Sequence, residues 1–149
     1  MDAIELLTND QRSLQHQMDR VLDSPTDEDQ VRSFREFHGL LRTYQKAEQS
    51  VFYASFGRDP AFEQVLERAS LLHRGLTKRA ETVANMIEKD DTVLLRAELS
   101  SLQHLLSELI ELDQAEIFPL AHRTLSRGLR ERLGRHLEAE KHETGLSAA

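Results

Sequence analysis

The chain has 149 residues, a net charge of −7 and no cysteine. Without thiols it can form neither a disulfide scaffold nor a thiolate metal site, so any metal would depend on His, Asp or Glu. The acidic balance disfavours nucleic-acid binding, because phosphate contacts need clustered Lys and Arg. No apolar run approaches the roughly 18 residues of a membrane helix, and the chain does not open like a signal peptide. We therefore expect a soluble, cytoplasmic helical protein, with residues 1–149 forming one domain.

Capping and helix-breaking residues divide the chain into helical segments. Ser24 and Pro25 suit the N-cap and first position of a helix, whereas Gly57 suits a helix end, and Asp59 and Pro60 suit a new start. The pattern predicts helices over 3–23, 26–56, 60–88, 91–121 and 126–142. Because the connections are short, we expect an all-α fold, an up-down-up-down four-helix bundle with a short C-terminal helix.

The inward stripes of these helices, read at steps of three and four residues, are apolar except near one level. The polar interruptions are Gln11, Tyr44, Glu48, His73 and Asp113. Late positions in the long second and fourth helices can meet the middle of the first and third, which permits one buried polar cluster. Buried carboxylates cost several kcal/mol unless they are paired, hydrogen-bonded or bound to metal. A protonated His73 or a cation could supply the counter-charge.

The same spacing predicts which apolar residues near the helix ends face the core and which face outward. Val51 and Leu120 fall on the inward stripes of the second and fourth helices. Phe52, Phe56 and Leu146 fall off the stripes and are candidates for contact with a partner, either a second copy in a homodimer or another protein.

Four ordered segments carry a family resemblance: 1–7 (MDAIELL), 47–53 (AEQSVFY), 116–121 (EIFPLA) and 133–141 (LGRHLEAEK). Together they resemble the haemerythrin-like (HHE cation-binding) domain family. The resemblance covers nearly the whole chain. It implies a four-helix bundle that holds two non-haem irons between its helices and serves dioxygen binding, oxygen or redox sensing, or iron handling.

The ligand positions that the resemblance implies are only partly kept. Gln11 stands at the histidine position of the first helix, Tyr44 at that of the second and Leu109 at that of the fourth. The positions that keep a ligand type are Glu48, His73 and Asp113. These three are candidate residual metal ligands, with Tyr44 and Gln11 as substituted positions, so the resemblance implies a degenerate di-iron site.

Two interpretations remain open. In the first, the bundle is a metal-free scaffold, regulatory or interaction module without cofactor, in which Tyr44 and Gln11 donate hydrogen bonds to the two carboxylates. In the second, Glu48, His73 and Asp113 hold a non-haem iron or another divalent ion for dioxygen or redox sensing or iron handling. Without a phosphate loop or nucleophile elbow we expect no enzyme, and weak redox or peroxide activity would need bound metal.

The other histidines are not expected to take part in a site. His104 and Glu108 repeat the His-x-x-x-Glu spacing, but they lie about 140° around the helix from the inward stripe, at ~100° per residue. A solvated contact between the two is the better interpretation. Surface or helix-end positions are expected for the rest, which are His16, His38, His122, His136 and His142.

Overall fold

The computed structural model describes residues 1–143, which are helical and contain no strand, so the predicted all-α class is confirmed. The elements are α1 (Ala3–Leu22), α2 (Asp27–Ala47), the π-helix η1 (Glu48–Phe52), the 3₁₀-helix η2 (Tyr53–Phe56), α3 (Pro60–Glu88), α4 (Leu95–Leu112), the π-helix η3 (Asp113–Ile117), α5 (Phe118–Thr124) and α6 (Arg127–Glu143). None of the described helices is long and apolar enough to cross a membrane.

The second helix begins at Asp27, one residue later than the sequence predicts. Thr26, in extended conformation, is its N-cap and accepts a 3.1 Å hydrogen bond from the Asp29 amide through its hydroxyl oxygen. The predicted cap, Ser24, instead donates to the carbonyl of Arg20, 2.6 Å away, and so closes α1. Ser24 and Pro25 therefore belong to the connection between α1 and α2, because Thr26 provides the hydrogen-bond acceptor for the Asp29 amide in the first turn of α2.

The other caps follow the expected logic with one shift. Gly57 has a φ of 60°, which a glycine adopts without strain, and Asp59 caps α3 with Pro60 in its first turn. The fourth helix starts at Leu95 rather than at residue 91. Asp90 turns the chain with a φ of 55°, so the residues that follow must leave the helical direction before α4 can begin. The helical path then continues to Thr124, beyond the predicted end at 121.

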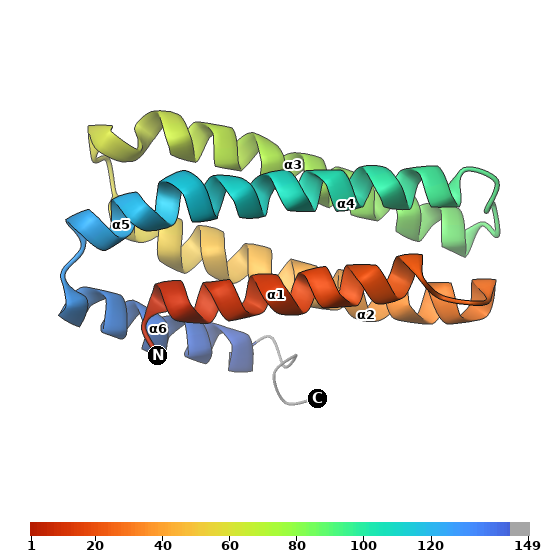
Figure 1. Ribbon diagram of the computed structural model, residues 1–149, viewed down its shortest axis with the longest axis horizontal. Coiled ribbons are helices and arrows are strands. Elements are labelled where there is room, and N and C mark those ends of the chain that lie inside the picture. Colours follow the sequence, from red (N-terminus) through yellow and green to blue (C-terminus); the bar gives the residue numbers. More distant parts are fainter. Residues whose placement is uncertain (144–149) are drawn as a thin grey trace.

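The long helices form two antiparallel pairs that face each other across the core. α1 lies against α2 and α3 against α4, and each pair is joined by a short connection (Figure 1). α6 lies on the outside, along α1 and the end of α2 that carries η1 (Figure 1). Gly134 of α6 allows close approach, since a Cβ there would lie 2.5 Å from the carbonyl oxygen of Met1. The last helix thus anchors the N-terminus on the bundle.

The two π-helices shift the inward stripe by one residue. In η1, Phe52 is fully buried whereas Val51 is only half-buried, and Phe56 in η2 is also buried. The expectation that Phe52 and Phe56 face a partner is therefore wrong, and Leu146 lies outside the described residues. A π-turn adds one residue to the α-helical repeat, so every position after it rotates relative to an α-helical extrapolation.

The same shift occurs in the fourth helical stretch. Ile117 at the end of η3 is buried, as are Phe118 and Ala121 of α5, whereas Leu120, expected to face inward, is only half-buried. Glu116 is carried to the surface, where it forms an ion pair with Arg68 at 2.6 Å. Both shifts begin at a buried acidic residue, since η1 starts at Glu48 and η3 starts at Asp113.

A buried carboxylate and tyrosine cluster as the candidate functional site

The five polar residues that interrupt the inward stripes lie together inside the bundle. Gln11, Tyr44, Glu48, His73 and Asp113 are each buried, with no more than 2% of the residue exposed. They come from α1, α2, η1, α3 and η3, so the cluster joins both helix pairs. The structure therefore places all of these candidate residues in a single hydrogen-bonded group, which we call the carboxylate cluster.

Tyr53 completes this cluster. Its hydroxyl lies 2.8 Å from Glu48 Oε1 and 2.8 Å from Asp113 Oδ1. Sequence reasoning missed it because a residue five positions after Glu48 would point about 140° away in a regular α-helix, at ~100° per residue. The π-turn of η1 rotates it inward. The apolar periodicity of the sequence does not mark Tyr53. It could have been predicted only by assuming a π-turn that begins at the buried residue Glu48.

Gln11 and Tyr44 complete the hydrogen bonding of the two carboxyl groups. Gln11 Nε2 donates to the Tyr44 hydroxyl oxygen at 2.7 Å and to Asp113 Oδ2 at 2.9 Å. The Tyr44 hydroxyl donates to Glu48 Oε2 at 2.8 Å and lies 3.2 Å from Asp113 Oδ2. As a result, both oxygens of Glu48 and both oxygens of Asp113 have a hydrogen-bonding partner.

The geometry requires a proton on one carboxyl group. Tyr53 has a single hydroxyl proton, yet its oxygen is equally close to an oxygen of Glu48 and one of Asp113. If Tyr53 donates to Glu48, Asp113 Oδ1 must carry a proton and donate to Tyr53. Burial, followed by the negative charge of Glu48, raises the pKa of Asp113 well above its usual value, which agrees with this assignment.

The remaining acidic groups are shifted in the same direction. Burial raises the pKa of Glu48, although hydrogen bonds from Asp113, Tyr44 and Tyr53 oppose the shift. Burial and the neighbouring carboxylates also raise the pKa values of Tyr44 and Tyr53. The cluster therefore keeps both phenols and at least one carboxyl group protonated near neutral pH, which limits the charge buried in the core.

His73 is a neutral hydrogen-bond donor. Burial lowers its pKa to about 4. Its Nε2 lies 2.9 Å from Glu48 Oε1, and its Nδ1 lies 3.1 Å from Gln45 Nε2, which also donates to the His73 carbonyl at 3.0 Å. Because an amide nitrogen can only donate, Nδ1 must be the acceptor and Nε2 must carry the proton. The protonated His73 considered as a counter-charge is thus not the form that this environment favours.

A second layer of glutamines holds the cluster in place. Gln45 is buried in α2, and its Oε1 lies 3.4 Å from the Thr77 hydroxyl of α3. Gln114 Nε2 donates to Gln11 Oε1 at 2.8 Å, which fixes the amide of Gln11 with its nitrogen toward Asp113 and Tyr44. Neither glutamine interrupts an apolar stripe, so the sequence pattern carried no signal for them.

The arrangement of donors does not fit a metal ion. To bind one, His73 would have to offer a lone pair at Nε2 and carry its proton on Nδ1, where the Gln45 amide nitrogen already points a hydrogen. The carboxylate oxygens are likewise turned toward phenol, imidazole and amide donors. Within residues 1–143 no group of three or more His, Asp or Glu side chains is placed to hold a metal ion.

The histidines expected outside the site lie outside it. His104 and Glu108 form an exposed pair on α4 at 2.7 Å. His38 is half-buried, with its ring centroid 5.4 Å from that of Phe34. The exposed histidines are His16, His122, His136 and His142.

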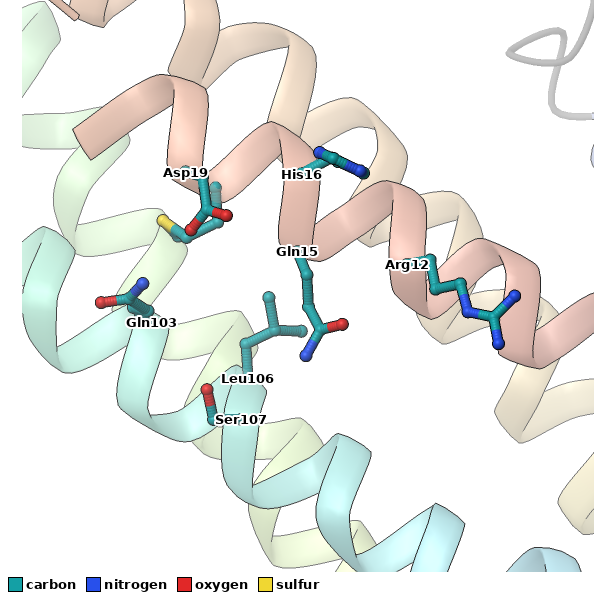
Figure 2. Close-up of a pocket in the computed structure, with 8 residues that line it drawn as sticks. Arg12, Gln15, His16, Asp19, Gln103, Leu106 and Ser107 are labelled. Atoms are coloured by element: carbon teal, nitrogen blue, oxygen red, sulfur yellow. The ribbon is translucent and has the colours of Figure 1, made fainter. Parts of the chain in front are cut away.

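A polar groove marks the seam where the two helix pairs meet at α1 and α4. It has a volume of about 360 Å³ and is lined by Arg12, Gln15, His16 and Asp19 of α1 and by Gln103, Leu106 and Ser107 of α4 (Figure 2). Gln15 and Leu106 extend toward each other across the gap (Figure 2). This groove is open and lined by exposed polar groups, in contrast to the closed carboxylate cluster.

Comparisons with protein-family models, with curated proteins and with solved structures found no match to this chain. The function of the protein must therefore be inferred from the residues of the cluster and from their surroundings.

Proposed function

We propose that this protein is a haemerythrin-like bundle in which a hydrogen-bonded network has replaced the metals, so that it acts as a metal-free scaffold or interaction module. The observation that carries the proposal is that all four buried carboxyl oxygens of Glu48 and Asp113 have hydrogen-bond partners within the protein. Tyr53 and His73 donate to Glu48 Oε1, and Tyr44 donates to Glu48 Oε2. Gln11 donates to Asp113 Oδ2, and a protonated Asp113 Oδ1 donates to the Tyr53 hydroxyl oxygen. A network closed in this way needs no cation.

The positions of the cluster support the haemerythrin-like origin. The residues that the resemblance assigns to former ligand positions are in hydrogen-bond contact, and the fourth-helix position, Leu109, is buried in the core. Substituting imidazoles by an amide and a phenol converts lone-pair donors for metal into hydrogen-bond donors for carboxylates. The same positions then hold the helices together without a metal.

As a scaffold, the network sets the register between the two helix pairs. Apolar side chains alone tolerate sliding and repacking, whereas a buried network is satisfied in one arrangement. The structure leaves apolar side chains outside for a partner: Val93 and Leu94, in the turn before α4, are 89% and 62% exposed. In an interaction role, the buried network would hold the helices in register, and Val93 and Leu94 would be candidate residues for contact with a partner.

Metal analysis tests the proposal directly. We expect protein made in iron-supplemented medium and purified without chelator to contain no stoichiometric metal. The matched control is the triple variant Gln11→His, Tyr44→His, Leu109→His, which restores imidazoles at the three substituted positions and should gain metal. Stoichiometric iron or another divalent ion in the unaltered protein would overturn the proposal in favour of a residual non-haem iron protein.

A second experiment tests the structural role. Replacing Gln11, Glu48, His73 and Asp113 together by leucine, with Tyr44→Phe and Tyr53→Phe, converts the cluster to an apolar core of similar shape. We expect the free energy of unfolding in urea to hold or rise, because apolar replacement of a buried polar network is often neutral or stabilising. A strongly destabilised variant that nevertheless keeps its helical circular dichroism would contradict this expectation.

A further inference from the structure

A small pocket lies beside the carboxylate cluster, between α1, α2 and the C-terminal part of α6. Its volume is about 130 Å³. The residues that line it are Asp10, Ser13, Leu14, Leu40, Thr43, Tyr44 and Lys141. Tyr44 belongs to both structures, since its hydroxyl lies in the cluster and its side chain forms part of the pocket wall.

We propose that this pocket binds a small neutral amphiphile, a molecule with an apolar body about the size of one six-membered ring and a single hydroxyl head. The inference goes beyond the scaffold role, because it gives the protein a ligand that can be sensed at Tyr44. It does not depend on the metal content of the cluster.

The apolar part of the pocket fits such a body. Leu14 and Tyr44 are buried, whereas Leu40 leaves 38% of its surface exposed to solvent. A ligand in contact with Leu40 would remove this apolar surface from water, which is favourable by roughly 25 cal/mol per Å². A cavity of about 150 Å³ lined by apolar side chains is known to accept benzene, so the volume suits a single ring.

The ion pair in the pocket wall favours one kind of head group. Asp10 of α1 and Lys141 of α6 form an ion pair at 2.5 Å, and each side chain is only about one-fifth exposed, at 22% and 21%. A hydroxyl can donate to the Asp10 carboxylate and accept from the Lys141 ammonium. A charged head would meet one attractive and one repulsive charge of the ion pair while losing its own hydration, so a neutral head fits best.

The composition of the chain provides a direct readout. It has no tryptophan and only two tyrosines, which are Tyr44 and Tyr53 of the cluster. Tyrosine fluorescence therefore reports on the cluster alone. A ligand against Tyr44 would alter the environment of its ring and its hydrogen bond to Glu48, and would change this emission.

The test is a titration of the full chain with cyclohexanol, which does not itself fluoresce, followed by tyrosine emission and by calorimetry. We expect a saturable signal in both. Ser13→Phe fills the pocket from an exposed position and should weaken binding by at least about tenfold, a loss of roughly 1.4 kcal/mol. Ser100→Phe, on the exposed face of α4, is the matched control and should bind as the unaltered protein does.

Two further arms make the outcome decisive. Leu40→Glu puts a carboxylate on the pocket wall and should also abolish binding, which gives an independent variant if Ser13→Phe folds poorly. Cyclohexylamine and cyclohexanecarboxylate should bind at least about tenfold more weakly than cyclohexanol. No saturable signal in the unaltered protein, equal binding by Ser13→Phe and Leu40→Glu, or equal binding of the charged ligands would overturn the proposal. Metal analysis of the cluster is unaffected by any of these results.

Discussion

The two halves of the bundle differ in backbone conformation: one is built of regular α-helices, and the other contains π-turns. In the half near the α1–α2 and α3–α4 connections, Phe34, Phe37, Val83 and Leu99 are buried on regular α-helices. In the other half, the polar cluster coincides with π-turns that begin at Glu48 and Asp113. Apolar side chains need only be turned inward, whereas directional hydrogen bonds require the backbone to place donors and acceptors at fixed distances. The difference shows where polar chemistry has reshaped an ordinary bundle.

The largest expected effect lies in the apolar half. Phe37→Ala removes a fully buried ring and should cost about 3–5 kcal/mol of unfolding free energy in urea, through lost burial and the cavity left behind. Leu71→Ala, at a position that is 59% exposed, is the control and should change stability by less than about 0.5 kcal/mol. Similar losses for the two variants would show that the apolar half is not the main source of stability.

The pH response of His73 distinguishes the two halves, since within residues 1–143 the buried His, Asp and Glu side chains all belong to the carboxylate cluster. Its pKa is lowered to about 4 in the folded state, so the imidazole contributes stability above its unfolded pKa near 6.5 and loses it as the pH falls toward 4. We expect this contribution to amount to roughly 3 kcal/mol.

The measurement compares unfolding free energies of the unaltered protein and His73→Gln between pH 7 and pH 4. Glutamine at position 73 does not gain a proton between pH 7 and pH 4. The difference in unfolding free energy between the two proteins should therefore shrink as the pH falls. Parallel curves would mean that the pKa of His73 is the same in the folded and the unfolded state. The carboxyl groups act in the opposite direction, because their raised pKa values favour the folded state at low pH, but they are present in both proteins.

Removing one donor from the cluster tests how complete the network is. Tyr53→Phe leaves the shape of the ring but removes the hydroxyl between Glu48 and Asp113, and should cost about 1–3 kcal/mol in urea unfolding. Phe56→Tyr adds a hydroxyl to a buried ring on the same segment that is stacked on Phe62, and should also destabilise. A neutral Tyr53→Phe would imply that the hydroxyl is dispensable.

Alkaline titration examines the same phenols without mutation. The pKa values of Tyr44 and Tyr53 are raised in the folded state, so these groups favour folding below the unfolded value near 10, and this contribution is lost as the pH rises above it. Tyrosinate absorbance should therefore appear only together with the loss of helical circular dichroism. Absorbance that rises near pH 10 in a protein that is still folded would contradict the burial of the phenols.

The smallest effect concerns the start of α2, at the apolar end of the molecule. Thr26→Ala removes the side chain that accepts from the Asp29 amide and should cost about 1 kcal/mol. Ser24→Ala removes only a hydrogen bond to Arg20 and should cost less. The reverse order in thermal or urea unfolding would restore Ser24 as the cap.

Much of the fold could be predicted because local rules suffice for it. Asp59, Pro60 and Gly57 mark the ends of helices by their own backbone preferences. The inward stripes also exposed the five polar positions, since a polar residue among apolar neighbours at steps of three and four is visible in the sequence. Beyond η1 and η3 this extrapolation failed, because Phe52 is buried whereas Leu120 is only half-buried.

The sequence by itself determined the helical class, most of the helix ends and the residue types available to the core. Only the tertiary structure decided that Tyr53 joins the cluster, that one of the two buried carboxyl groups holds a proton and that His73 donates from Nε2 to Glu48. These features depend on distances between side chains from different helices. The periodicity of one helix carries no information about such distances, because π-turns and neighbouring donors are set only when the helices pack together.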